Sequence, residues 1–203
     1  MRSYLVIDLS RRSTLGVLLA GAAAVAMPGV ALALSPDKAV RLVEALIADI
    51  NKVISSGKSE AAMYREFERI FTRYADVPTI ARYSLGANAR QASKSQLSAY
   101  TKVYTGYISR KYGKRFREFL GGRLEVQDAR TVKKSIEVRT VAHLRGEAPF
   151  KVDFLVRDGM SKFYNMTIDG VNMLQLERTE IGAMLDRRKG NIDALIQDLK
   201  TAS

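Results

Sequence analysis

The chain has 203 residues, no cysteine and a single histidine, and its 33 basic and 21 acidic residues give a net charge of +12. The lack of cysteine excludes disulfides, thiolate catalysis and cysteine-ligated metal sites. The basic residues are scattered in runs of no more than three, so a positively charged membrane-facing surface is expected, and nucleic acid is not expected as a partner.

Residues 1–33 have the three parts of a bacterial secretory signal. A basic start with Arg2, Arg11 and Arg12 precedes a weakly apolar run over 15–27, which is too short to span a bilayer. Small residues, Ala31 and Ala33, supply a cleavage site. The segment SRRSTLG at 10–16 resembles a twin-arginine export signal. We expect cleavage after Ala33 and a mature periplasmic domain over 34–203 with a net charge of +10; an uncleaved membrane anchor is the alternative.

Four helices are predicted in the first half of the mature chain. Ser35 and Pro36 are typical of a helix start, and apolar residues follow at helical spacing as far as Gly57. A second helix is expected from about Ser59 and a short third one after Asp76. A capping box, Ser93-x-x-Gln96, predicts the longest helix, roughly over 95–120.

The spacing of apolar residues then changes from helical to alternating. Four alternating stretches, near 124–127, 136–144, 150–157 and 164–169, predict about four antiparallel strands with one apolar face. Helical spacing returns after Gly170, in two stretches separated by Gly190. The predicted fold class is therefore α+β, with N-terminal and C-terminal helices packed on a curved antiparallel sheet around an apolar cavity.

The sequence nominates no catalytic or metal site. His143 is predicted to lie within a strand, on the face opposite Val138 and Ala142, without a second histidine or a cysteine to complete a ligand set or a nucleophile pair. No glycine-rich phosphate loop is present either. An enzyme is not expected, nor a cofactor other than bound cargo.

Several short segments resemble one family in their order and spacing. They are IARYSLG at 80–86, RQAS at 90–93, VDF at 152–154, YNMTIDGVNM at 164–173, Arg178, and IDALI at 192–196. Together they are similar to the MlaC, or toluene-tolerance, family of periplasmic lipid carriers. The chain departs from the family pattern at Ser161 and Asn165, where Trp and Asp are commoner, and at Asp169 and Asn172, where Glu and Ser are commoner.

The resemblance implies a soluble carrier that shuttles a phospholipid between an inner-membrane ABC transporter complex and an outer-membrane lipoprotein. A hopanoid-type lipid as cargo, a non-catalytic adaptor and an enzyme with a cone-like α+β fold are the alternatives. The aromatic and aliphatic residues expected to bind the lipid are Phe71, Tyr74, Tyr83, Tyr104, Tyr107, Ile108, Val138, Val152, Phe154, Tyr164, Met166, Ile168 and Met173. Three arginines, Arg82, Arg90 and Arg178, are expected at the headgroup or at docking surfaces. The alternatives are an ordinary core position for each apolar residue and a structural ion pair or plain surface position for each arginine.

Overall fold

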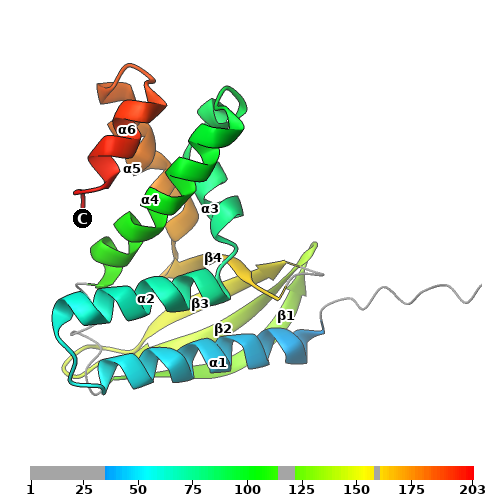
Figure 1. Ribbon diagram of the computed structural model, residues 1–203. Coiled ribbons are helices and arrows are strands. Elements are labelled where there is room, and N and C mark those ends of the chain that lie inside the picture. The colour runs from blue at the N-terminus through cyan, green and yellow to red at the C-terminus, as the bar shows by residue number, and fades with distance from the viewer. Residues whose placement is uncertain (1–34, 114–121, 158–160) are drawn as a thin grey trace, which may run out of the picture. The chain divides into compact units, whose positions relative to one another are not determined.

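The computed structural model describes residues 35–113, 122–157 and 161–203 (Figure 1). The predicted signal peptide and residues 114–120 of the predicted longest helix lie outside these ranges. The helices are α1 (Pro36–Ile54), α2 (Glu60–Tyr74), α3 (Val77–Ser84), the 3-10 helix η1 (Gly86–Arg90), α4 (Lys94–Gly113), α5 (Met173–Arg187) and α6 (Ile192–Leu199). The strands are β1 (Arg123–Val132), β2 (Ser135–His143), β3 (Phe150–Arg157), β4 (Phe163–Ile168) and β5 (Val171–Asn172).

Side-chain caps start α1 and α4 where the sequence predicted these helices. The Ser35 hydroxyl accepts a hydrogen bond from the Lys38 backbone N–H at the start of α1. The capping box at α4 is reciprocal: the Gln96 N–H donates to the Ser93 hydroxyl at 3.1 Å, and the Ser93 N–H donates to the Gln96 side chain at 3.0 Å. These local bonds confirm the predicted start of the longest helix to within one residue.

The sheet is an antiparallel meander in the order β1-β2-β3-β4-β5. Its apolar face is continuous across the central strands, because Val138 pairs with Phe154 and Phe154 pairs with Met166. The fifth strand, of two residues, was not predicted. It forms because Asp169 and Gly170, with φ of +47° and +81°, fold the chain back onto the end of β4 before α5 begins.

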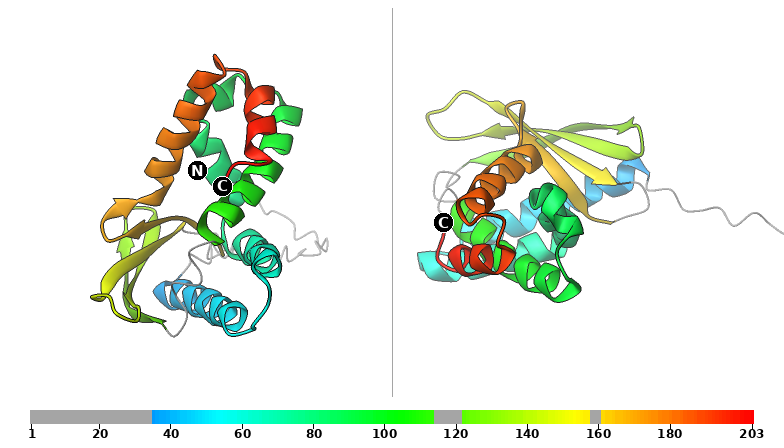
Figure 2. Two further views of the ribbon diagram at one scale, coloured as in Figure 1. Left: turned by 90° about the vertical axis from the view of Figure 1, so that its left-hand side faces the viewer. Right: turned by 90° about the horizontal axis from the view of Figure 1, so that it is seen from above.

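Helices α1 and α2 lie over one face of the sheet, and α3, α4, α5 and α6 pack together to one side of it (Figures 1 and 2). Helix α1 lies along β1 and β2, and α3 and α5 contact β4. The last helix, α6, packs on α4 instead, where the Arg110 guanidinium donates to the carbonyls of Leu199 and Ala202 at 2.6 and 3.0 Å. Of the C-terminal helices, it is therefore α5 that packs on the sheet.

The junction between α2 and α3 is fixed to the sheet. The Asp76 N–H donates to the Phe163 carbonyl at 2.8 Å, which joins Ala75 to β4 as a short parallel bridge. This contact holds the end of α2 at β4. In the described part of the chain, the helices are all too short or too polar to cross a membrane.

Candidate functional site

A cavity of about 560 Å³ lies between the helices and the apolar face of the sheet. Its walls are overwhelmingly aliphatic and aromatic. They consist of Leu46, Ile50, Phe67, Ile70, Phe71, Ile80, Tyr104, Ile108, Tyr112, Leu124, Leu144, Glu147, Phe150, Val152, Phe154, Phe163, Tyr164, Asn165, Met166, Ile168, Val171, Met173, Leu174, Leu176 and Glu177. The volume is in the range of pockets that hold small organic ligands.

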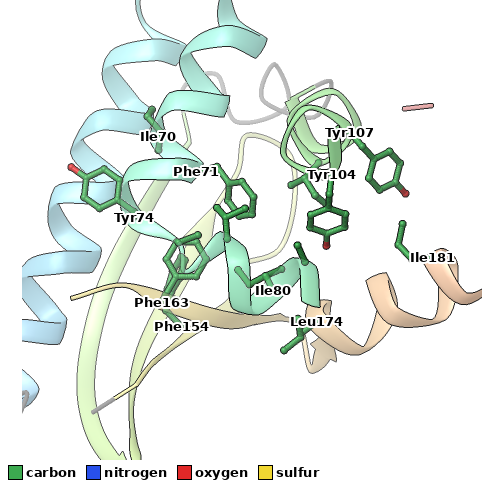
Figure 3. Packing of buried hydrophobic residues seen from close by; sticks show 14 of the residues in the cluster. Ile70, Phe71, Tyr74, Ile80, Tyr104, Tyr107, Phe154, Phe163, Leu174 and Ile181 are labelled. Carbon is green, nitrogen blue, oxygen red and sulfur yellow. The ribbon is translucent and has the colours of Figure 1, made fainter. Parts of the chain in front are cut away.

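Helix α2 forms one wall because its apolar residues recur at helical spacing. Phe67, Ile70 and Phe71 share the face that looks into the cavity, and the Phe67 and Phe71 rings stack with centroids 6.3 Å apart. In Figure 3, Phe71 projects from the side of α2 opposite Tyr74. The Phe154 and Phe163 rings lie together and meet edge to face at 5.6 Å.

The sheet forms the opposite wall through strand alternation. Val152 and Phe154 of β3 are buried, while the intervening Asp153 lies on the other face. Met166 and Ile168 pair with these two residues across β4 and line the same wall.

The cavity reaches the surface beside the turns at one end of the sheet. Glu147 in the β2–β3 turn is exposed, and Val171 and Leu176 are apolar residues left 52% and 36% exposed. The Asp169 N–H donates to the Lys151 carbonyl at 2.8 Å, which holds the β4–β5 turn beside β3. We define this region, around Glu147, Val171 and Leu176, as the mouth.

A polar cluster from α4 and α5 borders the cavity. The buried Glu177 accepts hydrogen bonds at Oε1 from the Lys111 ammonium at 2.7 Å and from the Tyr112 hydroxyl. Lys111 also pairs with Glu180. Burial lowers the pKa of Lys111, but the hydrogen bonds to Glu177 and Glu180 outweigh this effect and raise it overall. Burial, followed by the charge of Glu177, raises the pKa of Tyr112.

Two oxygens of this region, Tyr104 Oη and Glu177 Oε2, are buried without a hydrogen-bond partner among the described residues. Burial raises the pKa of Tyr104 well above its ordinary value, so its hydroxyl stays protonated. Nowhere in residues 35–113, 122–157 and 161–203 is a group of three or more His, Asp or Glu side chains placed to hold a metal ion.

Comparisons with known proteins agree with this architecture. A sequence profile for the MlaC protein matches residues 41–201, which is most of the chain. The chain belongs to the MlaC family. Among solved structures, it is similar to a phospholipid-binding protein from Ralstonia solanacearum in complex with a phospholipid. The TM-score is 0.69 and the identity 18%, over 79% of this chain and 94% of that one. A search among curated proteins found no match.

Nine of the thirteen residues predicted to bind lipid line the cavity of this MlaC-family fold. They are Phe71, Tyr104, Ile108, Val152, Phe154, Tyr164, Met166, Ile168 and Met173. The helical and strand periodicities correctly placed these side chains on the faces that turn toward one another.

The other four predicted residues lie outside the cavity lining. Tyr74 projects from the other side of α2 than Phe71 does (Figure 3), and its hydroxyl donates to Asp49 of α1 at 2.7 Å. This hydrogen bond lowers the pKa of Asp49. Val138 is completely buried on β2, the strand that α1 partly covers.

Tyr83 and Tyr107 bind polar partners on α5. Tyr83 is 38% exposed and donates to the Gln175 side chain at 3.1 Å. Tyr107 donates to Glu180 at 3.1 Å, and burial raises its pKa to about 12. Both tyrosines join helices to α5 and do not face the cavity.

None of the three predicted arginines lines the cavity. Arg82 and Arg90 are exposed on α3 and η1. Arg178 stacks on the Tyr83 ring at 5.1 Å and lies against Gly86, where an added Cβ would be 3.3 Å from the guanidinium Nε. Arg178 therefore joins α5 to the end of α3, and any headgroup contact by these arginines takes place outside the cavity.

The sequence reasoning missed the polar lining residues Glu177 and Asn165. The buried Asn165 side chain accepts hydrogen bonds from the backbone N–H groups of Met166 at 2.8 Å and Leu174 at 3.1 Å, which ties β4 to the start of α5. Glu177 had one usable signal, because it lies three residues after the buried Leu174 and four before the buried Ile181 and so shares the inward face of α5.

Proposed function

We propose that this protein is a periplasmic carrier that holds the acyl chains of a phospholipid in the cavity between its helices and its sheet. The observation that carries the proposal is the cavity itself: about 560 Å³ with a nearly continuous apolar lining. An ordinary core is packed to the density of an organic crystal, so an apolar space of this size implies an apolar ligand. The fold is similar to that of a protein solved with a phospholipid bound.

The physical need for such a cavity is large. Each methylene removed from water contributes about 0.8 kcal/mol, so one long acyl chain costs on the order of 10 kcal/mol to keep in solution. The lining offsets this cost with aromatic walls and with adaptable Met166 and Met173. Exposed apolar Val171 and Leu176 at the mouth offer a route by which tails enter without crossing open water.

The proposed carrier is exported to the periplasm and moves lipid between two membranes. The chain is exported through the twin-arginine signal, is cleaved after Ala33, and moves lipid between an inner-membrane ABC transporter complex and an outer-membrane lipoprotein. The support is the signal pattern in residues 1–33 and membership of the MlaC family. The role is one of binding and release, without catalysis. An adaptor with a filled core is disfavoured by the cavity.

The test is mass spectrometry of an organic extract of the mature protein, purified from the periplasm without detergent. We expect near-stoichiometric phospholipid, and N-terminal sequencing of the same sample should begin at Leu34. A polycyclic hopanoid-type lipid would retain the carrier role and change its cargo. Absence of lipid, also after incubation with labelled vesicles, would refute the carrier function.

A further inference from the structure

The cavity has one polar end, at which two oxygens lack partners. Tyr104 is completely buried and Glu177 is 3% exposed; both line the cavity, and Tyr104 Oη and Glu177 Oε2 have no hydrogen-bond partner among the described residues. In Figure 3 the Tyr104 ring projects from α4 toward Ile80 and Leu174, which also line the cavity. Buried polar groups are normally paired, so this pair of oxygens requires an explanation.

Neighbouring hydroxyls on α4 show that the missing partners are not a general feature of the helix. One turn before Tyr104, the buried Tyr100 hydroxyl lies 2.7 Å from the Ser84 hydroxyl. Within the next turn, Tyr107 donates to Glu180 at 3.1 Å. The Ser84 hydroxyl bonds to the Ala81 carbonyl and to Tyr100. Burial raises the pKa of Tyr104 and the nearby Ser84 hydroxyl lowers this pKa slightly, yet Ser84 forms no hydrogen bond with Tyr104 Oη.

The two oxygens have complementary hydrogen-bonding needs. Tyr104 Oη carries a proton to donate, whereas the Oε2 of Glu177 only accepts, because Lys111 and Tyr112 are hydrogen-bonded to Oε1. A methylene satisfies neither oxygen. An ester or phosphate oxygen satisfies only the tyrosine, and an ammonium satisfies only the carboxylate. A hydroxyl group offers both an acceptor and a donor. After burial, the charge of Glu177 contributes to the raised pKa of Tyr104, so the two side chains lie near each other.

We propose that Tyr104 and Glu177 recognise a hydroxyl group on the cavity-buried part of the lipid, such as a hydroxylated acyl chain. The inference rests on the proposed carrier function and specifies its cargo class. The pair discriminates between lipids. A fully apolar tail would leave both oxygens desolvated and unpaired. The hydroxyl group of a hydroxylated tail instead forms hydrogen bonds with Tyr104 and Glu177 that replace those it loses on leaving water.

The experiment compares phosphatidylglycerol with plain saturated chains against the same lipid carrying one hydroxyl near the carboxyl end, the middle or the terminus of an acyl chain. Each competes with a fluorescent phospholipid bound to the mature protein. A hydrogen bond to a charged group supports a preference of about tenfold or more for at least one hydroxylated isomer. Equal binding of plain and hydroxylated lipids would overturn the inference and leave the carrier function intact. Failure of the fluorescent phospholipid itself to bind would overturn both.

Two variants and a matched control locate the preference. Tyr104→Phe should remove most of it, because the plain lipid no longer leaves a tyrosine hydroxyl unpaired, and Glu177→Gln should also reduce it. Tyr100→Phe makes the same chemical change one turn away, outside the cavity, and should keep the preference. Thermal unfolding of each variant checks that it folds. If Tyr104→Phe still prefers the hydroxylated lipid, the assignment of the hydroxyl site to Tyr104 and Glu177 is refuted. This result decides the question even if Glu177→Gln fails to fold.

Discussion

Filling the cavity from the sheet side tests whether the space is real and whether lipid occupies it. Met166 is half-buried, lines the cavity and pairs with Phe154 across β3 and β4. In Met166→Trp, the tryptophan side chain has about six more heavy atoms than the methionine side chain and occupies space for about six methylenes, worth at most about 5 kcal/mol of lipid binding. The lipid recovers part of this loss by shifting toward the mouth, so we expect its affinity to fall at least about tenfold.

The same substitution should not destabilise the protein. An indole that enters empty apolar space gains contacts, whereas one forced into a filled core costs about 1–3 kcal/mol through overpacking. We therefore expect the free energy of unfolding, measured in urea on lipid-free protein, to stay constant or rise. Displacement of a fluorescent phospholipid measures the loss of affinity.

Thr167→Trp is the matched control. Thr167 is the next residue of β4, pairs with Asp153 and belongs to the opposite face of the sheet, so the same side chain there should leave lipid affinity unchanged. The reasoning is refuted if Met166→Trp binds lipid as the unsubstituted protein does and loses about 1–3 kcal/mol of stability, because the region would then be ordinary core.

Two further predictions concern stability. Gly182→Ala, inside α5 with open space around the new Cβ, should raise the free energy of unfolding by about 0.5–1 kcal/mol. Gly113→Ala should lower it, because its Cβ would lie 2.5 Å from the Tyr64 ring; urea titrations that give both variants the same sign would contradict this. Alkaline pH should also destabilise the fold, since burial raises the pKa of four tyrosines above the unfolded value near 10. These are Tyr100, Tyr104, Tyr107 and Tyr112. Their contribution is complete below about pH 10 and is lost as the pH rises through the folded-state pKa values, by about 1.4 kcal/mol per pH unit for each tyrosine. In urea unfolding above pH 10, Tyr104→Phe should reduce this slope by one such step, and an unchanged slope would refute the burial argument.

Local patterns were sufficient for much of the fold. The serine and aspartate caps, the change from helical to alternating spacing, and the turn glycines depend on neighbours within a few residues, so they can be read directly from the chain. The short strand β5 was not predicted, because two residues are too few to show an alternating pattern. Its existence depends on the turn at Asp169 and Gly170.

The sequence by itself determined the α+β class, the apolar faces and nine of the cavity-lining residues, because periodicity decides which side of an element a residue occupies. Only the tertiary structure decided which apolar residues border empty space and which fill the core. Tyr74 and Phe71 belong to the same helix, yet one binds Asp49 of α1 and the other lines the cavity. The position of Glu177 beside Lys111 and Tyr112 likewise depends on how α5 packs near α4. Glu177 is more than 60 residues away from both in the sequence, so no local pattern indicates this contact.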